Sequence, residues 1–102
     1  MKQIIILSTV PNQIIGTTLL NNLVEISVKL GNSKTTLLSI TANSTIILSN
    51  YPMPAGDDGI SITPESVNIT LGGSLYFECN GDSYPDYTKF GTRHFLIWSP
   101  AS

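Results

Sequence analysis

The chain has one histidine, His94, and one cysteine, Cys79, the two side chains best suited to acid–base and nucleophilic chemistry. A catalytic triad would need His94 beside a nucleophile and an orienting carboxylate. No G-x-S-x-G motif or similar turn presents such a nucleophile in this sequence. One histidine and one cysteine also cannot form a zinc site by themselves. We therefore predict that the protein is not an enzyme, has no cofactor, and uses His94 and Cys79 structurally.

Two pairs of acidic residues could bind calcium, Asp57 with Asp58 and Asp82 with Asp86. Neither pair follows the spacing of an EF-hand. Aspartates near glycines are typical of turns, because the short carboxylate bonds to its own backbone. The sequence therefore favours turns over a metal site.

Four aromatic residues in the last third of the chain could form a platform for sugars: Tyr84, Tyr87, Phe90 and Trp98. Aromatic residues at the strand ends of a small β domain more often fill the core. A carbohydrate- or receptor-binding β module is therefore kept as the alternative function.

The stretch Gly72–Trp98 reads as two strand-like runs joined by a loop of unusual composition. Pro85 fixes its own φ, and Gly91 offers a position where positive φ is inexpensive. Asp86 and Arg93 are spaced so that the planar guanidinium could tie the loop shut. We predict an Asp86–Arg93 pair that braces this loop.

A second marker, Val10-Pro11-Asn12-Gln13, follows the apolar run Ile4–Leu7. The simple interpretation is a turn. The amides of Asn12 and Gln13 can also bond a partner's backbone without carrying charge. We interpret Pro11, Asn12 and Gln13 as a rigid contact loop.

Together these two markers resemble the baseplate plug proteins of contractile-tailed phages. Those proteins are similar in length, open with an apolar strand and a VPNQ-like turn, and close with a G-x-L-x-F strand, a PDY-x-x-x-G-x-R loop and an aromatic-rich strand. The matching residues here are Val10 to Gln13, Gly73, Leu75, Phe77, Pro85, Asp86, Tyr87, Gly91 and Arg93. The resemblance covers both ends of the chain and is thin between Thr17 and Thr70.

The resemblance implies a structural component of the tail baseplate that docks at the junction of hub and tail tube and acts by binding only. Its partners would be the hub, the tail tube and wedge components, in a symmetric multi-copy assembly. It would reside in the virion after assembly in the host bacterial cytoplasm. On this reading Arg93 braces its loop through Asp86, Tyr87 packs beneath the loop, and Pro11 to Gln13 touch neighbours.

Charged residues make up 12% of the chain, about half the usual share. A surface low in charge suits a protein that stays in contact with neighbours. The net charge is -2 and the five basic residues are scattered, so we expect no nucleic-acid binding. The N-terminal apolar run is too short for a signal peptide, and no segment approaches the roughly 20 apolar residues of a membrane helix.

Apolar residues that alternate with polar ones along the chain indicate the fold class. Val24, Ile26, Val28 and Leu30 alternate with polar residues, which predicts a strand with one dry face. We expect further strands at Ile4–Ser8, Ile14–Leu20, Thr35–Thr41, Thr45–Leu48, Val67–Leu71, Leu75–Cys79 and Phe95–Trp98. Tyr51–Gly59 is expected to be irregular, with brief pairing near Ile60–Ile62 and one helical turn at Pro64–Ser66 capped by Thr63. The prediction is an all-β single domain, residues 1–102, a small sandwich or barrel of about seven short, mostly antiparallel strands.

Overall fold

The computed structural model of the chain describes residues 2–19, 21–31, 35–53, 63–82 and 84–100. Strands predominate in these residues, with one short α-helix and one 3-10 turn. The strands are β1 (Gln3–Ile5), β2 (Gln13–Leu19), β3 (Asn22–Leu30), β4 (Thr36–Ala42), β5 (Thr45–Met53), β6 (Gly73–Glu78) and β7 (Phe95–Pro100); the helix is α1 (Glu65–Leu71) and the 3-10 turn is η2 (Tyr87–Lys89).

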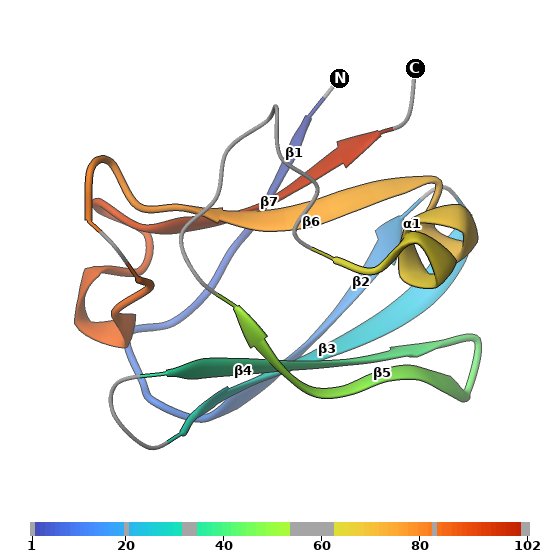
Figure 1. The fold of residues 1–102 in the computed structure, drawn as a ribbon, viewed down its shortest axis with the longest axis horizontal. Coiled ribbons are helices and arrows are strands. Elements are labelled where there is room, and N and C mark those ends of the chain that lie inside the picture. The colour runs from blue at the N-terminus through green and yellow to red at the C-terminus, as the bar shows by residue number, and fades with distance from the viewer. Residues whose placement is uncertain (1, 20, 32–34, 54–62, 83, 101–102) are drawn as a thin grey trace.

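The strands form two antiparallel sheets that face each other. One sheet has the order β1-β7-β6 and the other β2-β3-β4-β5. Figure 1 shows the two sheets as separate layers, with α1 at one end of the sandwich and η2 at the other. The all-β prediction is confirmed, and of the two architectures expected the sandwich is the one found, since the sheets do not close into a barrel. No helix among the described residues is long and apolar enough to cross a membrane.

The core lies between the sheets and is built largely by alternate residues of β2, β3, β4 and β7. On β3, Val24, Ile26 and Val28 are buried, as the alternation predicts, but Leu30 is 46% exposed. Leu30 is the last residue of its strand and lies where the sandwich ends, so its predicted burial is wrong. The other sheet contributes Leu75, Phe77, Leu96 and Trp98 to the same core.

The connections between neighbouring strands are tight where asparagine takes a left-handed conformation. Asn43 and Ser44 join β4 to β5 and have φ of 50° and 69°. Two successive positive φ values match the right-handed twist of paired strands, which is why two residues suffice for this hairpin. Asn21, with φ 66°, serves the same purpose between β2 and β3.

β5 is longer than the sequence predicts. The sequence predicts a strand that ends at Leu48 and an irregular segment from Tyr51, but pairing with β4 resumes at Tyr51 and continues to Met53. Asn50, with φ 47°, lies at the irregularity between the two paired stretches. Pro52 is tolerated because β5 is an edge strand, where a missing N–H breaks no ladder. The rest of the predicted irregular segment, 54–59, and the predicted pairing at 60–62 lie outside the described residues.

The segment predicted as a strand at Val67–Leu71 is most of helix α1, so that prediction is wrong. Val67, Ile69 and Leu71 alternate with polar residues and fit a strand as well as a short helix. In the structure Val67 and Leu71, four residues apart, are buried, and Ile69 is 74% exposed. Gly72 ends the helix in the left-handed conformation, and its N–H donates to the Asn68 carbonyl.

Thr63 does not cap the helix, although it anchors the helix start. The N-cap position is held by Pro64 without a side-chain hydrogen bond. The Thr63 hydroxyl instead donates to Asn68 Oδ1 and accepts from the Leu75 N–H at 3.2 Å, which ties α1 to β6.

Gly73 gives a test of how closely the sheet ends are packed. A Cβ on Gly73 would lie 2.2 Å from the Ser99 carbonyl oxygen and 2.7 Å from Pro100 Cα, so β7 would have to move. We expect Gly73→Ala to destabilise the fold by at least the ~1–3 kcal/mol typical of overpacking. Thermal unfolding followed by circular dichroism measures this. The control is Gly16→Ala on β2, where nothing lies within 4 Å of the new Cβ and the melting temperature should hold or rise. Equal melting temperatures for the two variants would contradict this packing.

Candidate functional site

The two sequence markers meet at one end of the sandwich. Pro11 and Tyr87 line the same small void together with Leu30 at the end of β3. The Asn12 side-chain oxygen accepts from the Leu30 N–H at 3.1 Å. The Thr36 hydroxyl donates to the Pro85 carbonyl at 3.3 Å. Val10–Gln13, Leu30, Asn80–Asp82 and Tyr84–His94 together are called the motif end below; it is the end of Figure 1 that carries η2.

The amides of Asn12 and Gln13 are used inside the chain. Gln13 Nε2 donates to the carbonyls of Ser8 and Val10, at 2.8 and 3.2 Å, and its Oε1 accepts from the Ser8 N–H at 2.9 Å. Together with the Asn12–Leu30 bond, these contacts close the turn between β1 and β2. These bonds give both amides a structural role in the turn, and the contact of Pro11, Asn12 and Gln13 with a partner stays a prediction. In this turn, Val10 is the exposed apolar residue.

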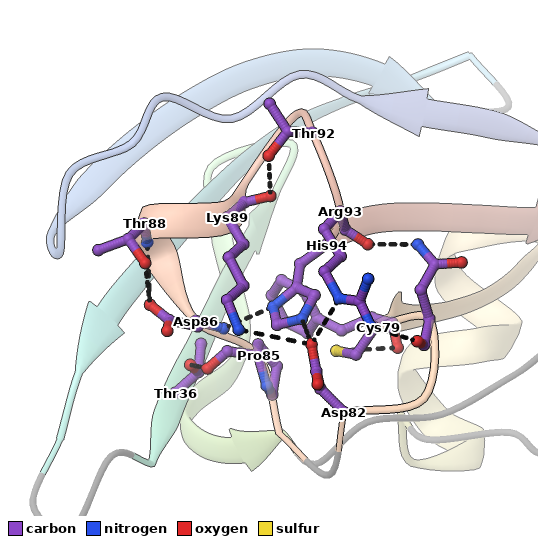
Figure 2. A network of polar contacts seen from close by, with 12 residues as sticks. Thr36, Cys79, Asp82, Pro85, Asp86, Thr88, Lys89, Thr92, Arg93 and His94 are labelled. Atoms are coloured by element: carbon purple, nitrogen blue, oxygen red, sulfur yellow. Dashed lines mark hydrogen bonds and ion pairs between the residues drawn. The ribbon is translucent and has the colours of Figure 1, made fainter.

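Asp82 is the centre of the polar network at the motif end (Figure 2). Its Oδ2 accepts from His94 Nε2 at 2.6 Å and from Arg93 Nε at 3.0 Å, and the Lys89 ammonium lies 3.6 Å away. The hydrogen bonds from His94 and Arg93 lower the pKa of Asp82 to about 2. The carboxylate is therefore charged throughout the physiological range, and it draws the two arms of the loop together.

Arg93 braces its loop through a different carboxylate from the one predicted. Its Nη2 donates to the Asn80 carbonyl at 3.0 Å while its Nε bonds Asp82. Asn80 in turn donates from Nδ2 to the Arg93 carbonyl. The predicted Asp86–Arg93 pair is wrong, because the loop brings Asp82, not Asp86, to the guanidinium.

Asp86 has a local role instead. Its Oδ1 accepts from the Thr88 N–H at 3.0 Å and from the Thr88 hydroxyl at 2.8 Å, which caps the start of η2. These bonds, the hydroxyl's first, lower the pKa of Asp86 below its ordinary value of 3.8.

Gly91 makes the sharp return from η2 into β7 possible. Its φ is 84°, a conformation that side chains other than glycine rarely adopt. The return lets three successive N–H groups, those of Thr92, Arg93 and His94, donate to the Lys89 carbonyl at 3.2, 3.0 and 2.9 Å. The glycine of the marker is thus explained by backbone geometry.

His94 is buried and both of its ring nitrogens are occupied. Nδ1 accepts from the Asp86 N–H at 2.9 Å, so the ring proton is on Nε2, which donates to Asp82. No lone pair is left to take a proton from a substrate. His94 is therefore arranged as a structural link and not as a general base.

Cys79 is equally unsuited to nucleophilic chemistry. It is a buried, free thiol whose Sγ donates to the Phe77 carbonyl at 3.8 Å. Burial, followed by the charges of Asp82 and Glu78, raises the pKa of Cys79 to about 11. At neutral pH it is a protonated thiol and not the reactive thiolate.

The described residues contain no group of three or more His, Cys, Asp or Glu side chains that could hold a metal ion. The predicted alternative of calcium at Asp82 and Asp86 does not fit this geometry, because Asp82 bonds cationic side chains and Asp86 caps η2. Asp57 and Asp58 lie outside the described residues.

The four aromatic residues do not form one platform. Phe90 and Trp98 are buried, and Phe90 stacks on Phe77 with ring centres 5.8 Å apart. Tyr87 packs partly against the core, and Tyr84 is 43% exposed. Two tyrosines are therefore left at the surface of the motif end.

Sequence reasoning gave Asp82 no bracing role and did not single out Asn80. Both lie in Asn80-Gly81-Asp82, where Asn80 has φ 48° and Gly81 98°. An Asn-Gly pair directly after a strand is a turn signal that could have marked this point as the base of the loop.

Comparison with known proteins gives one family. The sequence model described as "Cyanophage baseplate Pam3 plug gp18" matches residues 1–101. No curated protein matches the chain.

The Asp82 network predicts a specific pH dependence. Because folding lowers the pKa of Asp82 from 3.8 to about 2, its contribution to stability is complete above about pH 4 and is lost as the pH falls toward 2. We expect Asp82→Asn to have a lower melting temperature than the wild type at pH 6, and the difference to shrink steadily between pH 4 and pH 2. Melting curves in this range measure it.

The control for this experiment is Glu25→Gln on β3, which removes a carboxylate from an exposed position away from the network. Its difference from the wild type should change little over the same range. A gap between wild type and Asp82→Asn that is as large at pH 2 as at pH 6 would show that the carboxylate does not hold the loop.

Proposed function

The chain belongs to the cyanophage baseplate plug family, and from that premise we propose that it docks at the centre of a contractile tail baseplate, where the hub meets the tail tube. Membership makes it a structural baseplate component of the virion tail. The finer proposal is that it fills space and bridges subunits by binding alone. The observation that carries it is the family match over residues 1–101.

The chemistry of the motif end supports binding in place of catalysis. His94 has both nitrogens engaged in the fold, and Cys79 is a buried thiol with a raised pKa. Asp82 already bonds cationic groups of its own loop. Side chains whose donors and acceptors are already bonded within the fold hold the loop in shape, and they are poorly placed to accept a proton or to attack a substrate.

The outer face of the four-stranded sheet is the surface best suited to contact. Ile14, Leu23 and Ile46 are 67%, 71% and 72% exposed on it. The strand register places hydroxyl residues between them, namely Thr18, Ser27, Ser39 and Thr41. Only two charged residues, Glu25 and Lys29, point outward from the described part of this sheet. A face of this kind loses little when water is removed from it.

The partners we propose are the hub, the tail tube and wedge components, in a symmetric multi-copy assembly put together in the host cytoplasm. We also propose that residues 1–102 act as one β domain. The antiparallel pairing of β1 with β7 supports this, because it joins the two ends of the chain in one sheet.

Deletion of the gene tests the structural role. We expect tails whose baseplate centre is missing or disordered, because a protein that holds neighbours together leaves their contact surfaces unpaired when it is absent. Electron microscopy of the particles and plaque counts measure the result. Normal, infectious tails without the protein would reject the proposal and leave the carbohydrate- or receptor-binding module as the better reading.

A matched pair of substitutions tests the docking face. Ile46 on β5 and Ile69 on α1 are 72% and 74% exposed, so lysine should be tolerated by the free fold at either position. We expect Ile46→Lys to lower incorporation into tails about tenfold or more, because a charge is buried without a partner. Ile69→Lys should be incorporated normally. Complementation of the deletion, with immunoblots of purified particles, measures both. The reverse pattern would assign docking to the α1 end.

A further inference from the structure

A pocket at the motif end lies beside the internal network. It has a volume of about 250 Å³ and is lined by Leu30, Tyr84, Pro85, Asp86, Tyr87 and Thr88. Figure 2 shows the side chains of Asp86 and Thr88 bonded to each other, away from the Asp82 carboxylate that His94, Arg93 and Lys89 approach. A water molecule takes roughly 30 Å³, so this space can admit one long side chain.

The pocket carries one charge, that of Asp86. Both hydrogen bonds from Thr88 go to Oδ1. Oδ2 has no partner among the described residues. Arg93 bonds Asp82 and Lys89 lies 3.6 Å from the same carboxylate, so neither makes a direct ion pair with Asp86, although the charge of Lys89 acts on Asp86 from a distance. The negative charge of Asp86 is therefore not neutralised by a direct ion pair in the described part of the chain.

We propose that this pocket receives an arginine or lysine side chain from a neighbouring baseplate protein. The methylene stem would lie along Leu30 and Pro85, and the cationic head would reach Asp86 beside the tyrosine rings. The proposal rests on the proposed function, because the occupant comes from the assembly.

The wall chemistry favours a cation over other occupants. An apolar side chain would bury the Asp86 carboxylate without compensation, which is strongly unfavourable. A sugar needs several donors and acceptors in fixed positions, but the Thr88 hydroxyl proton is already given to Asp86. An arginine side chain can pack its methylene groups against the apolar walls and place its guanidinium beside the Asp86 carboxylate.

The first test is a titration of the ¹⁵N-labelled protein with N-acetyl-arginine-N-methylamide, followed by NMR. We expect saturable shifts at the amides of Leu30, Asp86 and Thr88. The matched citrulline compound, which has the same shape without the charge, should bind about tenfold more weakly. Equal affinity for the two compounds, or no shift at these amides, would overturn the proposal.

Variants make the assignment specific. Asp86→Asn removes the charge but keeps the side-chain oxygen that caps Thr88, so the loop should stay folded while the preference for arginine over citrulline disappears. Glu25→Gln, the matched loss of charge outside the pocket, should keep the preference. If Asp86→Asn binds the arginine compound as the wild type does, the charge has no part in the site.

A reconstruction of the tail at side-chain resolution separates this proposal from the proposed function. A cationic head within hydrogen-bond distance of Asp86 Oδ2 supports the pocket. A baseplate that contains the protein but places an apolar, acidic or neutral group, or none, in this pocket overturns the pocket and leaves the structural role intact. Absence of the protein from the baseplate would overturn the structural role itself.

Discussion

The motif end depends on the burial of His94. An imidazole removed from water needs a partner for each nitrogen, and this one bonds the side chain of Asp82 and the backbone N–H of Asp86. The two partners lie in different parts of the loop, so one ring fixes the distance between them. Arg93, the neighbour of His94 in sequence, then reaches Asp82 and Asn80, which closes the base of the loop. The position of Pro85 against Thr36, and with it the tyrosine-lined pocket, follows from this arrangement.

The residues of the two sequence markers serve mainly to hold this shape. Gln13 and Asn12 close one turn with their amides, Gly91 allows another, and Gly73 leaves room for the backbone of β7. A motif therefore identifies the fold of the motif end more directly than it identifies the surface that meets a partner. The exposed apolar residues of the four-stranded sheet, such as Leu23 and Ile46, belong to no motif. Many side chains of the right polarity could serve on a contact face, whereas few residues can fill a position with positive φ.

The sequence predicts those parts of the structure that are decided locally. The alternation at Val24–Val28 depends on nearest neighbours, and the strand with one buried face that it predicts is found. The strand prediction for Val67–Leu71 failed because five residues show the same pattern in a short helix and in a strand. The end of β5 was missed because the tolerance of Pro52 depends on its being at a sheet edge, which the local sequence does not contain. Likewise the choice of Asp82 over Asp86 as the partner of Arg93 is set by the path of the loop and by the burial of His94.

The distribution of charge connects the fold to assembly. The chain has few charged residues, and at the motif end it uses Asp82, Lys89 and Arg93 on one another. The hydrogen bonds of Asp82 hold the loop in one shape, and the carboxylates of Asp82 and Asp86 together balance the charges of Lys89 and Arg93, so the loop adds little net charge to the surface. A rigid loop loses little conformational entropy when a neighbour docks, and a nearly neutral face loses little hydration. Both effects lower the free energy that assembly must overcome. A carboxylate outside such a pair then stands out as a place where a partner's charge is favoured, and in the described part of the motif end Asp86 is that carboxylate.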